Sequence, residues 1–89
     1  MSKVLATADY RISGTGYDGK PLDETVHAEL RESGAFQYGN GTCMVLEWSY
    51  GHRESFDTRY EKVNVWNFKE FAKKVIEDRV LDTIKVEVI

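Results

Sequence analysis

One glycine-rich segment near the N-terminus has the spacing of a phosphate-binding motif. Residues 14–19 read Gly-Thr-Gly-Tyr-Asp-Gly, which is a literal G-x-G-x-x-G. A dinucleotide site needs a helix directly after this motif, because the amides at the helix N-terminus bind the pyrophosphate. Here the chain instead enters a second segment with the alternation of a strand. The motif therefore indicates a mobile, acidic hairpin loop with Tyr17 at its tip, able to contact a partner.

His27, His52 and Cys43 are the side chains best suited to bind a transition metal or to act as a nucleophile. Zinc sites are built from close pairs such as C-x₂-C or H-x₃-H, and these three residues form no such pair. We therefore expect two surface histidines and a packed or half-exposed thiol, with no metal and no cofactor. A lone cysteine cannot form an intrachain disulfide, which favours a reducing, cytoplasmic location.

Carboxylates alternate with arginines along three segments, at Asp9/Arg11, Glu29/Arg31 and Asp57/Arg59. A carboxylate pair can carry out acid–base catalysis, but on the wet face of a sheet such residues form cross-strand charge ladders that are weakly stabilising. A catalytic site also needs a concave pocket, and we expect little volume for one in a sheet covered by a single helix. The ladder interpretation predicts that the chain is not an enzyme. A small enzyme that uses one of these carboxylates is an alternative.

Composition and charge indicate one folded α+β domain over residues 1–89. The chain is 42% hydrophobic and 30% charged, with a net charge of −3, values typical of a small globular domain. The acidic excess lies in the first half, and a protein that binds phosphate backbones needs a basic face. Direct nucleic-acid binding is therefore disfavoured. Because the N-terminus turns polar within ten residues, we expect no signal peptide and no membrane anchor.

Five segments alternate apolar and polar residues with a period of two, as strands with one buried and one wet face do. The residues expected to face inward are Val4, Ala6, Ala8, Tyr10 and Ile12; Val26, Ala28 and Leu30; Met44, Leu46, Trp48 and Tyr50; Phe56 and Tyr60; and Ile84, Val86 and Val88. RNA-binding sheets place aromatic rings on the exposed face for base stacking. The inward position of these aromatic residues argues against RNA recognition by the open face.

The register of the third and fourth strands depends on the loop that joins them. A two-residue loop at Gly51-His52 would place core residues opposite solvent-facing ones, which strand geometry does not permit. An odd-length loop or a bulge restores the match. We expect the odd loop, with Trp48 opposite Phe56 and Met44 opposite Tyr60.

A second turn is predicted at Asn40-Gly41, because both central positions of a tight hairpin turn need positive φ. This turn would extend the second strand through residues 36–38. The two faces of that strand then agree only if Ser33-Gly34 forms a bulge, a position that suits glycine.

Residues 68–80 change to the helical period and predict the single helix. Asn67 is the expected N-cap, Glu70 the expected partner in a capping box, and Trp66 a hydrophobic staple against Phe71. The stripe expected to face the sheet consists of Phe68, Phe71, Ala72, Val75 and Ile76.

The predicted order is therefore β-β-β-β-α-β. Four strands in a meander alternate in direction, and the helix returns the chain so that residues 83–89 run antiparallel beside the first strand. The fold class is α+β: a single antiparallel sheet of four to five strands, in the order 5-1-2-3-4, with one helix packed on one face.

These features predict a non-enzymatic module that binds another protein, one with a basic surface. The expected partner-binding residues are Tyr17, Asp18, Asp23, Glu24, Glu29 and Glu32. The binding surface is either the loop of residues 14–23 or the open face of the sheet. A homodimer or assembly subunit joined through an edge strand is an alternative, since unpaired edges are ready to pair.

In size, charge and architecture the chain resembles the small cytoplasmic proteins that phages encode to bind and inhibit host factors, anti-CRISPR proteins among them. The resemblance is one of profile over the whole chain and rests on no motif. It implies an inhibitor or regulator of a host protein that handles nucleic acid.

Overall fold

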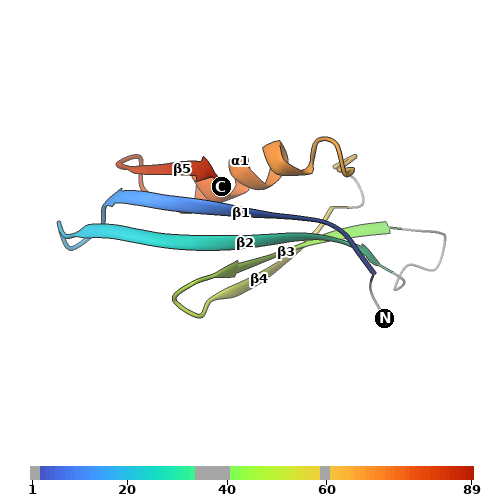
Figure 1. Ribbon diagram of the computed structural model, residues 1–89, viewed down its shortest axis with the longest axis horizontal. Helices are drawn as coiled ribbons and strands as arrows, with labels where there is room; N and C mark the ends of the chain where they lie inside the picture. The colour runs from blue at the N-terminus through green and yellow to red at the C-terminus, as the bar shows by residue number, and fades with distance from the viewer. Residues whose placement is uncertain (1–2, 34–40, 59–60) are drawn as a thin grey trace.

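The computed structural model describes residues 3–33, 41–58 and 61–89, which form one twisted sheet with a helix along one side (Figure 1). The elements in chain order are β1 (Lys3–Thr15), β2 (Pro21–Ser33), β3 (Gly41–Trp48), β4 (Arg53–Asp57), α1 (Phe68–Arg79) and β5 (Ile84–Val88). The sheet is antiparallel throughout and has the order β4-β3-β2-β1-β5. The predicted α+β fold and strand order are confirmed.

The long β1–β2 hairpin forms the spine of the sheet. Its loop, residues 16–20, is closed by hydrogen bonds from the Gly16 amide to the Lys20 carbonyl (2.9 Å) and from the Gly19 amide to the Gly16 carbonyl (3.0 Å). Gly19 has a φ of +75°, which favours glycine. The glycine-rich motif is therefore a hairpin loop, as predicted.

The core lies between the helix and one face of the sheet. Tyr10 is fully buried, and its hydroxyl donates a 2.8 Å hydrogen bond to the backbone carbonyl of Lys69, which ties α1 to the sheet. Burial, reinforced by the negative charge of Asp9, raises the pKa of Tyr10 to about 12. The other core residues are Ala8, Ile12, Val26, Ala28, Leu30, Met44, Leu46, Trp48, Val63, Phe68, Ala72, Ile76 and Val86.

Three residues expected in the core are exposed. Val4 is 41% exposed, because a register shift between Val4 and Ala6 places Val4 opposite Arg31 on the wet face. Tyr50 is 62% exposed, because β3 ends at Trp48 and Tyr50 belongs to the following turn. Val88 is 45% exposed near the end of the edge strand β5.

The β3–β4 loop is odd in length, as predicted, but the predicted partners were wrong. Trp48 lies opposite His52, whose carbonyl accepts the Trp48 amide at 2.7 Å, and Met44 pairs with Phe56. The predicted pairs would centre the reversal of the chain on His52, whereas the observed pairs centre it on Tyr50. The earlier reversal is possible because Gly51 adopts a φ of +102°, which lets the chain turn directly after Trp48. Tyr60 lies outside the described residues.

The helix begins differently from the sequence prediction. Asn67 occupies the N-cap position, but its side chain makes no capping hydrogen bond. Instead, Asn64 Oδ1 accepts the amides of Trp66 (2.9 Å) and Asn67 (3.0 Å), so the Asn67 amide is already bonded and Glu70 does not cap it. Trp66 is 88% exposed and is not a staple. The capping box and the staple were therefore wrong, because the turn that leads into α1 starts earlier, at Asn64.

Three sequence predictions lie wholly or partly outside the described residues: the turn at Asn40-Gly41, the strand extension over residues 36–38 and the bulge at Ser33-Gly34. Within the described part of the chain, no helix has the length and apolar character needed to cross a membrane.

Candidate functional site

Three segments meet at one end of the sheet: the β1–β2 loop, the β3–β4 turn and the chain that follows α1 (Figure 1). They surround an open cavity of about 390 Å³. Its floor is apolar and includes Ile12, Leu22, Leu81 and Ile84. The expectation of little pocket volume was wrong, because the β1–β2 hairpin extends past the end of the helix and leaves part of the apolar face uncovered by α1.

Aromatic side chains form the rim of this cavity. Tyr17, in the β1–β2 loop, is 94% exposed. Tyr50 stacks on the His52 ring, with centroids 6.3 Å apart and planes 7° apart, and its ring centroid lies 5.9 Å from that of Trp48. Partial burial raises the pKa of Tyr50, helped by the negative charges of Glu54 and then Glu24.

Glu54 supplies a carboxylate to the wall of the cavity. It lies opposite Leu46, on the sheet face that carries the core. Its Oε2 accepts the Trp48 indole N–H at 3.2 Å and lies 3.7 Å from His52 Nε2, while its Oε1 lies 3.4 Å from Arg79 Nε. Glu54 was not among the site residues predicted from the sequence. The signal that could have found it is its alternation with Phe56, which predicts a carboxylate on the inward face.

The β3–β4 turn is tied to β2 next to the acidic residues predicted as a binding surface. The Ser49 amide donates to the Thr25 carbonyl (2.9 Å), and the Thr25 amide donates to Ser49 Oγ (3.0 Å). The Ser49 hydroxyl in turn donates to the carboxylate of Glu24. These bonds hold Tyr50 beside the β1–β2 hairpin.

Four of the six predicted partner-binding residues gather at this end. Tyr17, Asp18, Asp23 and Glu24 line one shallow depression that shares Tyr17 with the cavity. Asp18 Oδ1 accepts the Lys20 amide at 3.0 Å. Asp23 accepts two 2.9 Å hydrogen bonds from the Arg11 guanidinium, and these bonds lower its pKa.

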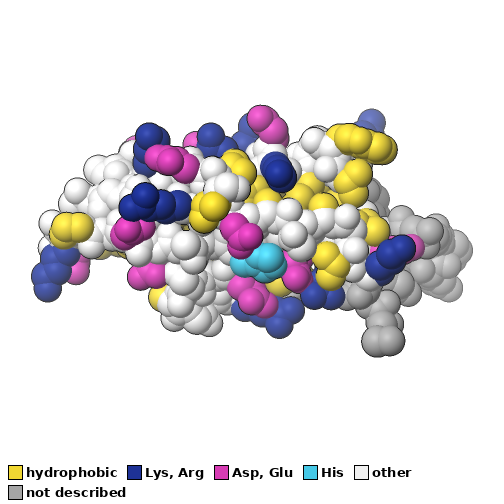
Figure 2. All heavy atoms as spheres, viewed as in Figure 1, with side chains coloured by type: hydrophobic (Ala, Val, Ile, Leu, Met, Phe, Trp, Pro, Cys, Tyr) yellow, Lys and Arg dark blue, Asp and Glu magenta, His cyan; other side chains and the backbone are white. Residues whose placement is uncertain are grey.

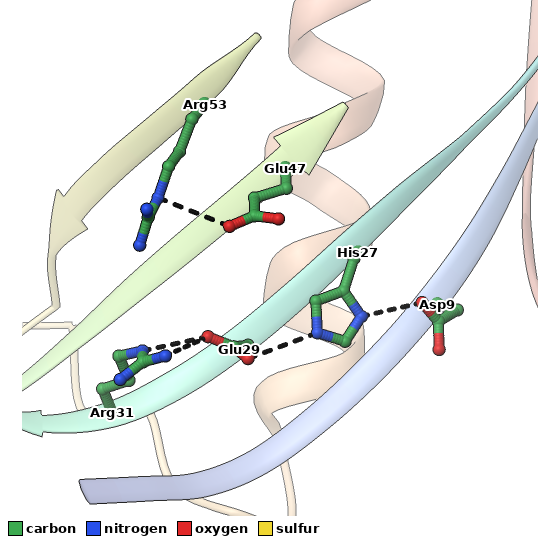
Figure 3. A network of polar contacts seen from close by, with 6 residues as sticks. All are labelled: Asp9, His27, Glu29, Arg31, Glu47 and Arg53. Atoms are coloured by element: carbon green, nitrogen blue, oxygen red, sulfur yellow. Dashed lines mark hydrogen bonds and ion pairs between the residues drawn. The ribbon is translucent and has the colours of Figure 1, made fainter. Parts of the chain in front are cut away.

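The other two predicted residues lie elsewhere. Glu29 belongs to a polar network on the open face of the sheet, where it accepts hydrogen bonds from Arg31 at 2.6 and 2.9 Å (Figure 3). These bonds, with a smaller contribution from His27, lower the pKa of Glu29. Glu32 pairs with Lys3 and Thr42, far along β2 from the loop. The structure therefore does not bring all six residues into one surface.

The open face carries interspersed charges of both signs, but the predicted cross-strand ladders are confirmed only in part. Asp9 with His27 and Glu47 with Arg53 pair across strands, whereas Glu29 pairs with Arg31 of its own strand. His27 lies between two carboxylates, with Nδ1 2.8 Å from Asp9 and Nε2 3.4 Å from Glu29 (Figure 3). The face shown in Figure 2 has a histidine ring surrounded by acidic side chains, with basic side chains around them. Arg11 binds Asp23 rather than Asp9, and Arg59 lies outside the described residues.

Cys43 is a half-buried free thiol on β3. Among residues 3–33, 41–58 and 61–89, no group of three or more His, Cys, Asp or Glu side chains has the geometry to hold a metal ion.

The described residues form a small α+β fold with a charged sheet face and an aromatic-rimmed cavity. In comparisons with known proteins, no family model, curated protein or solved structure matches the chain.

Proposed function

We propose that the chain is a non-enzymatic module that binds a partner protein with a basic surface, through the end of the sheet formed by residues 16–20 and 49–51. The observation that carries this proposal is the pair of exposed tyrosines, Tyr17 and Tyr50, at the rim of an apolar-floored cavity. Tyrosine contributes a large contact area at a low entropic cost, which makes it a common anchor of protein interfaces.

The charge of this surface supports a basic partner. Asp18 and Glu24 lie beside the exposed tyrosines, while the carboxylate of Asp23 is paired with Arg11. Lys20 is the cation of the same loop. The remaining acidic excess attracts a positively charged surface and speeds its approach at low salt.

The biological role that we propose is inhibition or regulation of a cytoplasmic protein that handles nucleic acid. A small acidic module that covers a basic groove excludes the nucleic acid that would otherwise lie there. The support is the profile of the chain, with 89 residues and a net charge of −3, together with the acidic end described above.

Binding fits the contacts of Glu54 better than catalysis does. The carboxylate accepts the Trp48 indole N–H and faces the Arg79 guanidinium, two groups that hold it in place as an acceptor. A carboxylate-dependent enzyme is the alternative for this cavity. It predicts that Glu54→Gln abolishes a reaction, whereas our proposal predicts that it changes only binding.

A capture experiment with matched charge reversals tests the proposal. The wild-type chain, an Asp18→Lys/Glu24→Lys variant and a Glu61→Lys/Glu70→Lys variant are immobilised and exposed to the native host cytoplasm. The two variants have the same net charge, and the second alters exposed residues of another region. We expect one partner on the wild type and on the second variant, but not on the first. Equal retention by both variants, or no specific partner on the wild type, would overturn the proposal.

A homodimer joined through an edge strand is the second candidate, and one observation favours it. The edge strand β5 ends at Val88, which is 45% exposed, and the next residue, Ile89, is 74% exposed. Size-exclusion chromatography with light scattering distinguishes the two. A dimer that persists on dilution and is lost in Val88→Lys would support the edge-strand homodimer. A monomeric wild-type chain would support the protein-binding module.

A further inference from the structure

The cavity beside the proposed interface combines an apolar floor with a polar wall. Ile12 is 2% exposed, and Leu22, Leu81 and Ile84 are half-buried around it. A volume of about 390 Å³ lies within the range of sites that bind small ligands or single side chains. The floor therefore suits an aliphatic or aromatic group. The polar wall determines which functional group at the end of that ligand can bind.

The wall presents aromatic rings that attract a cation. Trp48 at the end of β3, with Tyr50 and His52 in the β3–β4 turn, lines one side of the cavity, and Tyr17 lines it from the β1–β2 loop. A cation within about 6 Å of a tryptophan or tyrosine ring is attracted to its π face, and the attraction grows as water is removed. The half-enclosed cavity provides such a position next to Tyr50.

The Glu54 carboxylate has capacity for another donor. A carboxylate offers about four lone-pair sites, and Glu54 has three close contacts: the Trp48 indole at 3.2 Å, Arg79 at 3.4 Å and His52 at 3.7 Å. Arg79 is also directed to the Phe56 ring, 5.2 Å from its centroid. The guanidinium therefore has a second contact outside the cavity, and an incoming cation can approach the opposite side of the carboxylate.

The sum of the neighbouring charges favours a cation. Glu54, Glu24 and Asp18 are the carboxylates at or beside the cavity, and Arg79 and Lys20 are the cations. The C-terminus of α1, which carries a partial negative charge, also lies at the cavity, because Arg79 and the two residues that follow the helix line it.

We infer that the cavity binds one lysine or arginine side chain of the partner. Its aliphatic stem lies on the floor formed by Ile12 and Leu22, and its charged head lies between the Tyr50 ring and the Glu54 carboxylate. This inference rests on the proposed function and specifies the residue type by which the partner is recognised.

Single-residue probes test the cavity without the partner. The amides of Nα-acetyl-lysine, Nα-acetyl-arginine and Nα-acetyl-norleucine are titrated into the ¹⁵N-labelled full chain and followed by NMR. We expect saturable shifts at Tyr17, Tyr50 and Leu81 with a charged probe, and binding about fivefold weaker with norleucine, which keeps the stem and lacks the charge. Equal binding of norleucine would overturn the inference.

Substitutions in the cavity provide a second test of the inferred lysine or arginine site. Tyr50→Ala removes an exposed ring, and Glu54→Gln keeps an acceptor for the Trp48 indole. Each substitution should lower the affinity for the charged probe by about fivefold. Trp66→Ala, which removes an exposed aromatic side chain outside the cavity, should leave this affinity unchanged. Unchanged binding in both cavity variants would overturn the inference.

The two proposals can fail separately. If the cavity variants retain a partner that Asp18→Lys/Glu24→Lys loses, the protein-binding function stands and the lysine or arginine site is wrong. If the charged probes bind selectively and no partner is captured, the cavity site stands and the proposed function is wrong.

Discussion

Trp48 Nε1 donates a 3.2 Å hydrogen bond to the carboxylate of Glu54 across the β3–β4 hairpin. Trp48 is 5% exposed, and its donor would be costly to leave without an acceptor. Among the described residues, every buried side-chain nitrogen and oxygen has a hydrogen-bond partner. The carboxylate on an otherwise apolar face is therefore part of the hairpin's structure as well as of the cavity wall.

Glu54→Ala should lower the free energy of unfolding by about 1–3 kcal/mol, because it leaves the Trp48 indole N–H without its acceptor. Urea denaturation followed by tryptophan fluorescence measures the change. Glu47→Ala is the control on the neighbouring strand, since its ion pair with Arg53 at 3.5 Å is exposed and should contribute only about 0–1 kcal/mol. Equal losses in the two variants would contradict the structural role of Glu54.

The helix stripe gives a second prediction. Phe68 is fully buried and Phe71 is only half-buried, although the sequence pattern assigns both to the same face. Phe68→Ala should destabilise the domain by about 3–5 kcal/mol, and Phe71→Ala by roughly half as much, because less apolar surface is lost. Chemical denaturation of both variants tests the order. A larger effect at Phe71 would mean that the helix is rotated from the position described.

The periodicity of the side chains was sufficient to predict the strands and the helix, because each depends on which face is buried. The order of the strands followed from the preference for short, uncrossed connections. The periodicity could not predict where a strand ends. Tyr50 continues the alternation of β3 and yet lies in the turn, since the positive φ of Gly51 lets the chain reverse immediately after Trp48. Val4 likewise follows the pattern of β1, but a bulge moves it to the wet face.

The site was partly predictable for the same reason. Tyr17 and its acidic neighbours come from one continuous segment, the β1–β2 loop and the first residues of β2, so sequence proximity alone brings them together. Tyr50 and Glu54 join them only because of the register of β3 on β4 and the contacts of Ser49 with β2. These contacts are long-range, and no local pattern encodes them.

Gly14 provides a third prediction, because β5 approaches it closely. A Cβ at this position would lie 2.2 Å from the carbonyl oxygen of Thr83, and the φ of Gly14 is +149°. Gly14→Ala should cost about 1–3 kcal/mol from backbone strain alone and should loosen the pairing of β1 with β5. Urea denaturation measures the cost, and amide exchange in β5 measures the loosening.

Gly19→Ala separates the two contributions. Gly19 also has a positive φ, +75°, but a Cβ at this position would have no other group within 4 Å. Its substitution should lower the free energy of unfolding by about 1–2 kcal/mol and leave amide exchange in β5 unchanged. If the β5 amides in Gly14→Ala are as well protected from exchange as in the wild type, β5 does not approach Gly14 as closely as the structure shows.

The network on the open face predicts a pH dependence of stability. The pKa of His27 is raised, chiefly by its hydrogen bond to Asp9 and also by Glu29. The folded state thus binds the proton more tightly than the unfolded chain does. The resulting stabilisation is fully present below the unfolded pKa of about 6.5 and is lost as the pH rises through the raised value.

Stability attributable to His27 should therefore decrease as the pH rises above about 6.5 and through the raised pKa, and His27→Gln should remove this part of the dependence. The side chain is 38% exposed, so the effect should be about 0–1 kcal/mol and should shrink in high salt. Urea denaturation across this range measures the dependence, and NMR titration of the ring measures the pKa directly. Asp9→Asn removes the largest cause and should lower the pKa of His27 towards its ordinary value. A ring that titrates at the same pH with and without the Asp9 carboxylate would show that the hydrogen bond does not hold the proton.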